Sequence, residues 1–157
     1  MMSDLEKFRR LSWRDRLLIL ETLISITLAS VAIAILSFRS VVSRASRMHR
    51  PTPLSTESTE DFVARLRWAI TAVAARVPWR AVCFQQGLAA HLMLRRRGIA
   101  SVIYYGAAQA PEAGELAAHV WVRAGPLDVI GCENASRYAL LATFPALKSE
   151  QPRAQSA

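Results

Sequence analysis

The sequence predicts an α+β fold in which helices come first and a small antiparallel sheet follows. Up to Arg97 the apolar residues recur mostly with a helical period, whereas beyond Gly98 the chain breaks into short β-branched and aromatic runs separated by turns. The full length of 157 residues is enough for one domain with a modest core.

The N-terminal segment, residues 1–50, contains a long apolar run at residues 17–36 in which Glu21 is the only charge. A run of this length can just cross a bilayer as a helix. It lacks the clean small-residue cleavage site of a signal peptide. We therefore keep two alternatives: a helix that crosses or lies on a membrane, and a helix packed against the rest of the domain or against a partner protein. Arginines flank the run on both sides, at Arg9, Arg10, Arg14 and Arg16 and at Arg39, Arg44 and Arg47.

Residues 51–58 have the composition of a linker, with two prolines and several hydroxyl groups. Ser58, followed three residues later by Asp61, predicts the capped start of a helix that ends before Pro78. A second helix is predicted over residues 82–97, because Gly98 is a natural helix stop. Arg97 and the two arginines before it suit the negative end of the helix dipole, although they could also contact a substrate.

The sheet is predicted from three short runs, residues 99–105, 118–123 and 127–131. The last two flank a Gly-Pro turn and should form a hairpin. Residues 106–116 read as a loop, and residues 134–144 as a short amphipathic helix. The main domain then covers residues 59–145, and the polar residues 146–157 form a disordered tail.

The composition narrows the function classes. The net charge is +8, mostly from arginine, which suits an acidic peptide, a membrane surface or simply a solvated basic face. No nucleic-acid-binding motif occurs, so we expect no nucleic-acid partner. Two cysteines do not make a disulfide framework, and the absence of CxxC and HxxxH spacings predicts neither a metal site nor a cofactor. This composition fits the reducing cytoplasm.

Cys83 is the candidate nucleophile. It begins the second predicted helix, where unpaired backbone N–H groups and the positive end of the dipole favour a thiolate. The same N–H groups could stabilise the oxyanion of a tetrahedral intermediate. The competing interpretation is a structural cysteine buried as a small apolar side chain.

His119, on the second predicted strand, favours the catalytic interpretation because a thiol needs a base. The base in turn needs an acceptor that fixes its tautomer. Asp128, nine residues further on, is the preferred acceptor, with Glu133 as the alternative. The choice depends on the turn length and on any bulge in the hairpin.

Three other residues are weaker candidates. His91 lies in the middle of a predicted helix, His49 lies in a basic stretch before the linker, and Cys132 has no helix start beside it. We expect Cys132 to be structural.

Three stretches together resemble the lasso peptide biosynthesis B2 proteins, which are leader peptidases of the transglutaminase-like cysteine protease superfamily. They are VPWRAVCFQQGLAAHLMLRRRGI, AHVWVR and DVIGCENASRYALLATFP, and they span residues 77–145. The resemblance implies a papain-like core, with the nucleophile on a helix packed against a small antiparallel sheet that bears the histidine and the acid. It transfers the nucleophile and the base to Cys83 and His119, and the acid to Asp128 with less support.

The resemblance also implies a function and partners. Such proteins remove the leader from a ribosomally made precursor peptide, so that a separate ATP-dependent cyclase can close a macrolactam. A B1-type element that recognises the leader is either fused or separate, and residues 1–50 do not resemble it, so we expect a separate recognition protein.

Two other functions stay open. One is acyl transfer to an amine, as in a transglutaminase or amidase. The other is a non-catalytic membrane-associated adaptor held by residues 17–36.

Overall fold

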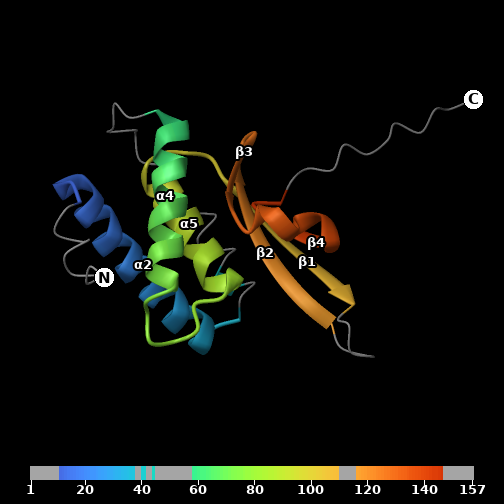
Figure 1. Ribbon diagram of the computed structural model, residues 1–157. Helices are drawn as coiled ribbons and strands as arrows, with labels where there is room; N and C mark the ends of the chain where they lie inside the picture. Colours follow the sequence, from blue (N-terminus) through green and yellow to red (C-terminus); the bar gives the residue numbers. More distant parts are fainter. Residues whose placement is uncertain (1–10, 38–39, 42–43, 45–57, 110–115, 147–157) are drawn as a thin grey trace, which may run out of the picture.

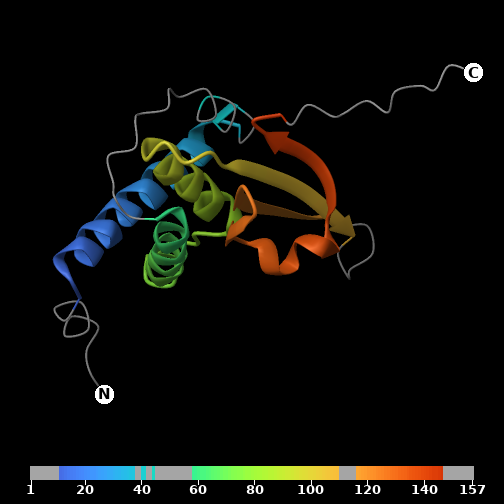
Figure 2. The same ribbon diagram turned by 90° about the horizontal axis from the view of Figure 1, so that it is seen from above.

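The chain folds into two layers, helices on one side and an antiparallel sheet on the other. Our computed structural model describes residues 11–37, 40–41, 44, 58–109 and 116–146. The helices α2 (Trp13–Ile35), α4 (Thr59–Ala74) and α5 (Cys83–Arg96) lie together beside the sheet (Figures 1 and 2). This arrangement confirms the predicted α+β class.

The sheet has the strand order β3-β2-β1-β4, and each neighbouring pair is antiparallel. The central strands are β2 and β1, and β3, the second strand of the predicted hairpin, lies at the edge beside β2. The strands are β1 (Val102–Gln109), β2 (Leu116–Ala124), β3 (Leu127–Ile130) and β4 (Ala139–Phe144).

The helix predicted over residues 134–144 is wrong. The chain instead forms a short 3₁₀ helix, η1 (Cys132–Arg137), and then strand β4. A short apolar run fits either a helix or a strand. Here the run becomes a strand because the free edge of β1 offers backbone hydrogen-bonding groups. Residues Ile103 to Ala107 of β1 pair with β4.

The helix boundaries follow local signals. The Ser58 hydroxyl accepts a hydrogen bond from the Asp61 backbone N–H at 3.1 Å, as the capping pattern predicts. Helix α4 ends at Ala74, before Pro78. Helix α5 ends where Gly98 takes a left-handed φ of 71°, which a residue with a Cβ rarely adopts.

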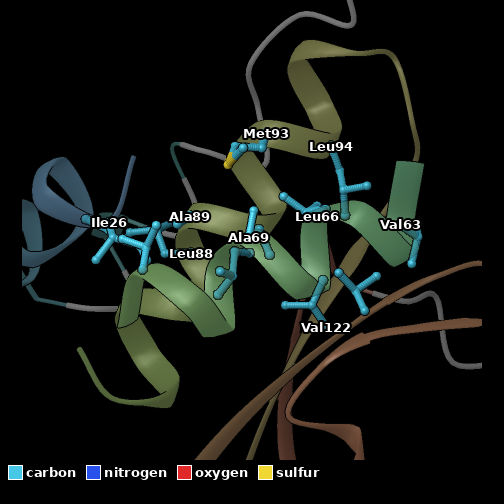
Figure 3. Close-up of a cluster of buried hydrophobic side chains, with 14 of the residues drawn as sticks. Ile26, Val63, Leu66, Ala69, Leu88, Ala89, Met93, Leu94 and Val122 are labelled. Carbon is cyan, nitrogen blue, oxygen red and sulfur yellow. The ribbon is translucent and has the colours of Figure 1, made fainter. Parts of the chain in front are cut away.

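One hydrophobic core joins the helices to the sheet. Ile26 of α2, Leu66 of α4, Leu88 of α5 and Val122 of β2 are each at most 1 % exposed. Figure 3 shows Ile26 beside Leu88 among the helices, and Val122 where the helices meet the sheet. Helix α5 contacts both α2 and β2 within this core, and this packing fixes the position of its first residue, Cys83.

Helix α2 belongs to this core through one face only. Ion pairs also hold it in place, among them Glu21 with Arg97 at 2.6 Å and Asp15 with Arg65 at 2.9 Å. Packing against the rest of the domain, one of the two alternatives for residues 17–36, is therefore found on that face. The linker prediction falls mainly on residues 51–57 and the tail prediction on residues 147–157, which lie outside the described residues.

Candidate functional site

Cys83 is the first residue of α5. Val82 precedes it as the N-cap and supplies no side-chain hydrogen bond, and the first turn contains no acidic residue. The first intrahelical bond runs from the Gln86 N–H to the Val82 carbonyl at 3.1 Å. The backbone N–H groups that precede this bond have no partner within the helix, so they can receive an anion beside the thiol.

A glutamine pair that the sequence analysis did not single out lies in the same turn. The side-chain amide of Gln86 donates to the Ala81 carbonyl at 2.6 Å and ties the helix start to the preceding loop. The carboxamide oxygen of Gln85 is buried and has no hydrogen-bond partner within the described part of the chain. Such groups are rare in native proteins, so Gln85 marks a polar position two residues from the nucleophile.

His119 lies on β2, and its orientation is set by a backbone group. Its Nε2 is 2.7 Å from the carbonyl oxygen of Gly131. A carbonyl can only accept, so Nε2 carries the proton. In the neutral imidazole the lone pair is then on Nδ1, which makes Nδ1 the atom able to take a proton from a thiol.

Two aromatic rings stack against the imidazole. The ring centroid of Tyr138 is 4.7 Å from that of His119, and the ring centroid of Trp121 is 5.9 Å from it. Trp121 comes from the same face of β2, two residues on, as the alternation of a strand requires. Tyr138 follows η1, so the unpredicted 3₁₀ turn is what brings it there.

Cys83 and His119 lie on two elements, α5 and β2, that pack against each other. No hydrogen bond between them is found among the described residues. Helix α5 packs on the other face of β2, where a Cβ on Gly87 would be only 2.6 Å from Val120 Cγ1. Cys83 is one helical turn before Gly87, so it lies with α5 on the Val120 face of β2. His119 is one residue before Val120, so its side chain lies on the opposite face of the strand.

Asp128 is held away from His119 by an ion pair. Its Oδ1 is 2.7 Å from the Arg123 Nε, and the two residues lie directly opposite each other in the β2–β3 ladder. His119 is four residues before Arg123, about 13 Å along the strand. Glu133, the alternative, is exposed on η1. The structure thus brings neither carboxylate into hydrogen bonding with His119, and a catalytic role for Asp128 stays a prediction.

Cys132 and His91 both form hydrogen bonds inside the domain. The Cys132 thiol donates to the Val122 carbonyl at 3.3 Å, and burial together with the neighbouring Asp128 raises its pKa to about 11. His91 is fully buried with Nδ1 2.9 Å from the Ser101 hydroxyl. Burial, assisted by the positive charge of Arg95, lowers the pKa of His91 to about 4. Both therefore stay uncharged near neutral pH.

No cluster of three or more His, Cys, Asp or Glu side chains able to hold a metal ion occurs within the part of the chain that the structure describes.

Comparison with protein families gives one match. The model of the family described as "Transglutaminase-like superfamily" matches residues 25–143. The match begins within α2 and ends within β4, so it contains every site residue discussed above. Comparison with curated proteins and with solved structures finds no match.

Proposed function

The chain belongs to the transglutaminase-like superfamily, and on that premise we propose that it is a cysteine peptidase that removes the leader from a lasso peptide precursor. The superfamily includes thiol peptidases and transglutaminases, which share acyl transfer through a cysteine. The lasso peptide substrate is supported by the resemblance of residues 77–145 to the B2 proteins. The observation that carries the catalytic part is the hydrogen bond between His119 Nε2 and the Gly131 carbonyl, which leaves Nδ1 as the base on a strand that α5 packs against.

The proposed reaction has two stages. His119 takes the thiol proton of Cys83, and the thiolate attacks the carbonyl carbon at the leader–core junction. The amide C–N bond breaks, His119 returns the proton to the departing amine of the core, and the leader remains as a thioester. Water, deprotonated by His119, then hydrolyses the thioester and releases the leader carboxylate. The N–H groups of the first turn of α5 are the proposed oxyanion donors.

This mechanism requires contact between Cys83 and His119, which the free protein does not make. Catalytic hydrogen bonds are often long in a free enzyme and shorten when substrate binds. Because α5 and His119 lie on opposite faces of β2, we propose that precursor binding moves the start of α5 relative to the strand so that the thiol and the imidazole meet. The backbone carbonyl of Gly131 orients the imidazole, and Asp128 remains a candidate for electrostatic support of the imidazolium.

We propose the precursor peptide, a separate B1-type recognition protein and an ATP-dependent macrolactam cyclase as partners, all in the cytoplasm. The support for these partners is the resemblance of residues 77–145 to the B2 proteins. No cofactor takes part in the proposed mechanism.

The test is cleavage of a precursor by the purified protein with its recognition partner. Cys83→Ala should abolish cleavage while leaving precursor binding intact, whereas the matched variant Cys132→Ala should keep it, because the Cys132 thiol is held protonated in a structural hydrogen bond. Iodoacetamide near neutral pH should modify Cys83 before Cys132. Cleavage that survives in Cys83→Ala, or equal labelling of the two thiols, would favour the adaptor alternative.

The mass of the products separates peptidase from acyl transferase. Hydrolysis adds one water across the cut bond, whereas transfer to an amine joins two molecules. The match to the superfamily supports both outcomes equally, so this measurement decides between them.

A further inference from the structure

Helix α2 exposes an apolar stripe along its whole length. One face is buried against α4 and α5, at positions such as Leu18, Ile26 and Ala29. On the opposite face seven large apolar side chains are 49–74 % exposed. We call these residues the outer stripe: Trp13, Leu17, Leu20, Ile24, Leu28, Val31 and Ile35.

The outer stripe is continuous and contains no charge. At about 100° per residue, its seven positions fall within about 80° of the helix circumference. From Trp13 to Ile35 it runs for about 33 Å. A helix that is apolar on every side needs an apolar environment on every side, and a patch of this size on a soluble domain marks a surface that binds something.

The apolar surface widens beside the stripe. A groove of about 770 Å³ runs between α2 and α4, with Leu23 on one wall and Trp68 on the other. Trp79 also lines the groove, and its indole N–H donates to the Ser30 hydroxyl at 3.1 Å. Trp13, Trp68 and Trp79 are all 38 % exposed or more, and indole rings favour the boundary between lipid and water.

Helix α2 is long and apolar enough to cross a bilayer, and no other helix within the described ranges meets both conditions. Its inner face nevertheless argues against crossing. That face packs on α4 and α5 along its length, and Glu21 bonds Arg97 of the segment that ends α5 at 2.6 and 2.9 Å. A crossing helix would carry these helices and their charges into hydrocarbon, which is costly.

We propose that α2 lies in the plane of an anionic bilayer surface, with the outer stripe in the boundary between headgroups and acyl chains. The inner face of the helix stays in the protein core. The protein is then held on one leaflet and its catalytic layer remains in water. This inference does not depend on the proposed peptidase activity.

Charge favours lipid over a protein partner as the occupant. Arginines stand at both ends of the stripe, with Arg14 exposed at the start and Arg44 exposed beyond the end. Arg96, 45 % exposed in its side chain, lies beside Glu21 at the flank of the helix. Together with the net charge of +8, these residues suit anionic headgroups around an apolar strip.

Flotation of the full-length protein with vesicles tests the proposal. Vesicles of phosphatidylcholine with 30 % phosphatidylglycerol, an anionic lipid, should carry most of the protein (about tenfold more than pure phosphatidylcholine), and salt should weaken this difference. The double variant Leu20→Glu/Leu28→Glu should lose binding at least tenfold. Its matched control is Leu140→Glu/Leu141→Glu, on the edge strand β4, where the side chains are equally exposed at 54 % and 61 %; this variant should bind as the wild type.

Two results would overturn the proposal. One is equal flotation of the two double variants. The other is absence of flotation by the wild type together with a dimer that Leu20→Glu/Leu28→Glu dissociates in light scattering, which would assign the stripe to a second copy. Circular dichroism of each variant verifies that the fold is kept.

Depth separates a helix in the membrane plane from one that crosses. A single tryptophan serves as the fluorescent probe. It is introduced by Ile24→Trp at the middle of the outer stripe, in a variant in which the four native tryptophans have been replaced by phenylalanine. Lipids brominated near the carbonyl should quench it more than lipids brominated at the chain end. The reverse order would place the middle of α2 at the bilayer centre and contradict the proposal.

Discussion

At the residue scale, Gly131 is the position on which the orientation of His119 depends. Its φ of 74° lies in the left-handed region, and a Cβ there would be 2.6 Å from the Val120 carbonyl oxygen and 3.4 Å from the His119 Nε2. Gly131→Ala should therefore displace the carbonyl that accepts from His119. We expect kcat to fall about 10²-fold with a small change in KM, and the pH profile to shift.

Asp128→Asn is the comparison for that variant. Because Asp128 pairs with Arg123 rather than with His119, we expect kcat to fall only a few-fold and the pH profile to stay in place. Arg123→Gln removes the other partner of the same ion pair, so it should cause a similarly small fall in kcat and leave the pH profile in place. A fall of 10²-fold in Asp128→Asn alone would show that the carboxylate supports the imidazolium after all.

His91 makes stability depend on pH in a defined window. Burial lowers its pKa to about 4 in the folded protein from 6.5 in the unfolded chain, so the unfolded state binds a proton first as pH falls. Stability is complete above pH 6.5 and declines towards pH 4, by up to about 3 kcal/mol. Urea unfolding at pH 7, 5.5 and 4.5 measures this. His91→Gln can keep a bond to Ser101 without titrating, and an unchanged slope in that variant would assign the effect to other groups.

At the element scale, Gly87 sets how closely α5 approaches β2. Alanine favours a helix over glycine by about 1 kcal/mol, yet its Cβ would be 2.6 Å from Val120 Cγ1. We expect Gly87→Ala to lower the free energy of unfolding by about 1 kcal/mol net. It should lower kcat more than this loss implies, because Cys83 lies one turn earlier on the same face.

A double-mutant cycle with Val120→Ala checks the cause. Removing the methyl groups that a Cβ at position 87 would meet should make the double variant more stable than the sum of the two single changes. Additive effects would mean that Gly87 does not set the spacing of α5 and β2.

At the scale of the whole molecule, α2 is part of the domain rather than an appendage. Its residues Leu18 and Ile26 lie in the core, and the Thr22 hydroxyl lies 3.8 Å from the Met93 sulfur. A chain that starts at residue 38 would expose the helix layer beneath α2. We expect it to lack a cooperative thermal transition, measured by circular dichroism, whereas the full chain shows one. A cooperative transition in the short chain, with cleavage activity kept, would contradict this.

Much of the fold could be predicted from the sequence because helix caps, helix stops and tight turns depend on neighbouring residues. The Ser58 cap, the Gly98 stop and the hairpin of β2 and β3 depend on residues a few positions apart, and each was found as predicted. The same is true of Cys83 at a helix start and His119 on a strand. Strand β4 was missed because its partner, β1, lies some forty residues earlier.

What the sequence by itself determined is the order of the elements as far as β3 and the place of the thiol and the imidazole on them, because spacing and caps act locally. Only the tertiary structure decided what completes the site and what α2 exposes. The register of β2 and β3 pairs Asp128 with Arg123, and the left-handed turn at Gly131 gives His119 a carbonyl instead. Helix packing buries one side of residues 17–36 and leaves the other apolar and open. These are long-range contacts, and composition and periodicity do not specify them.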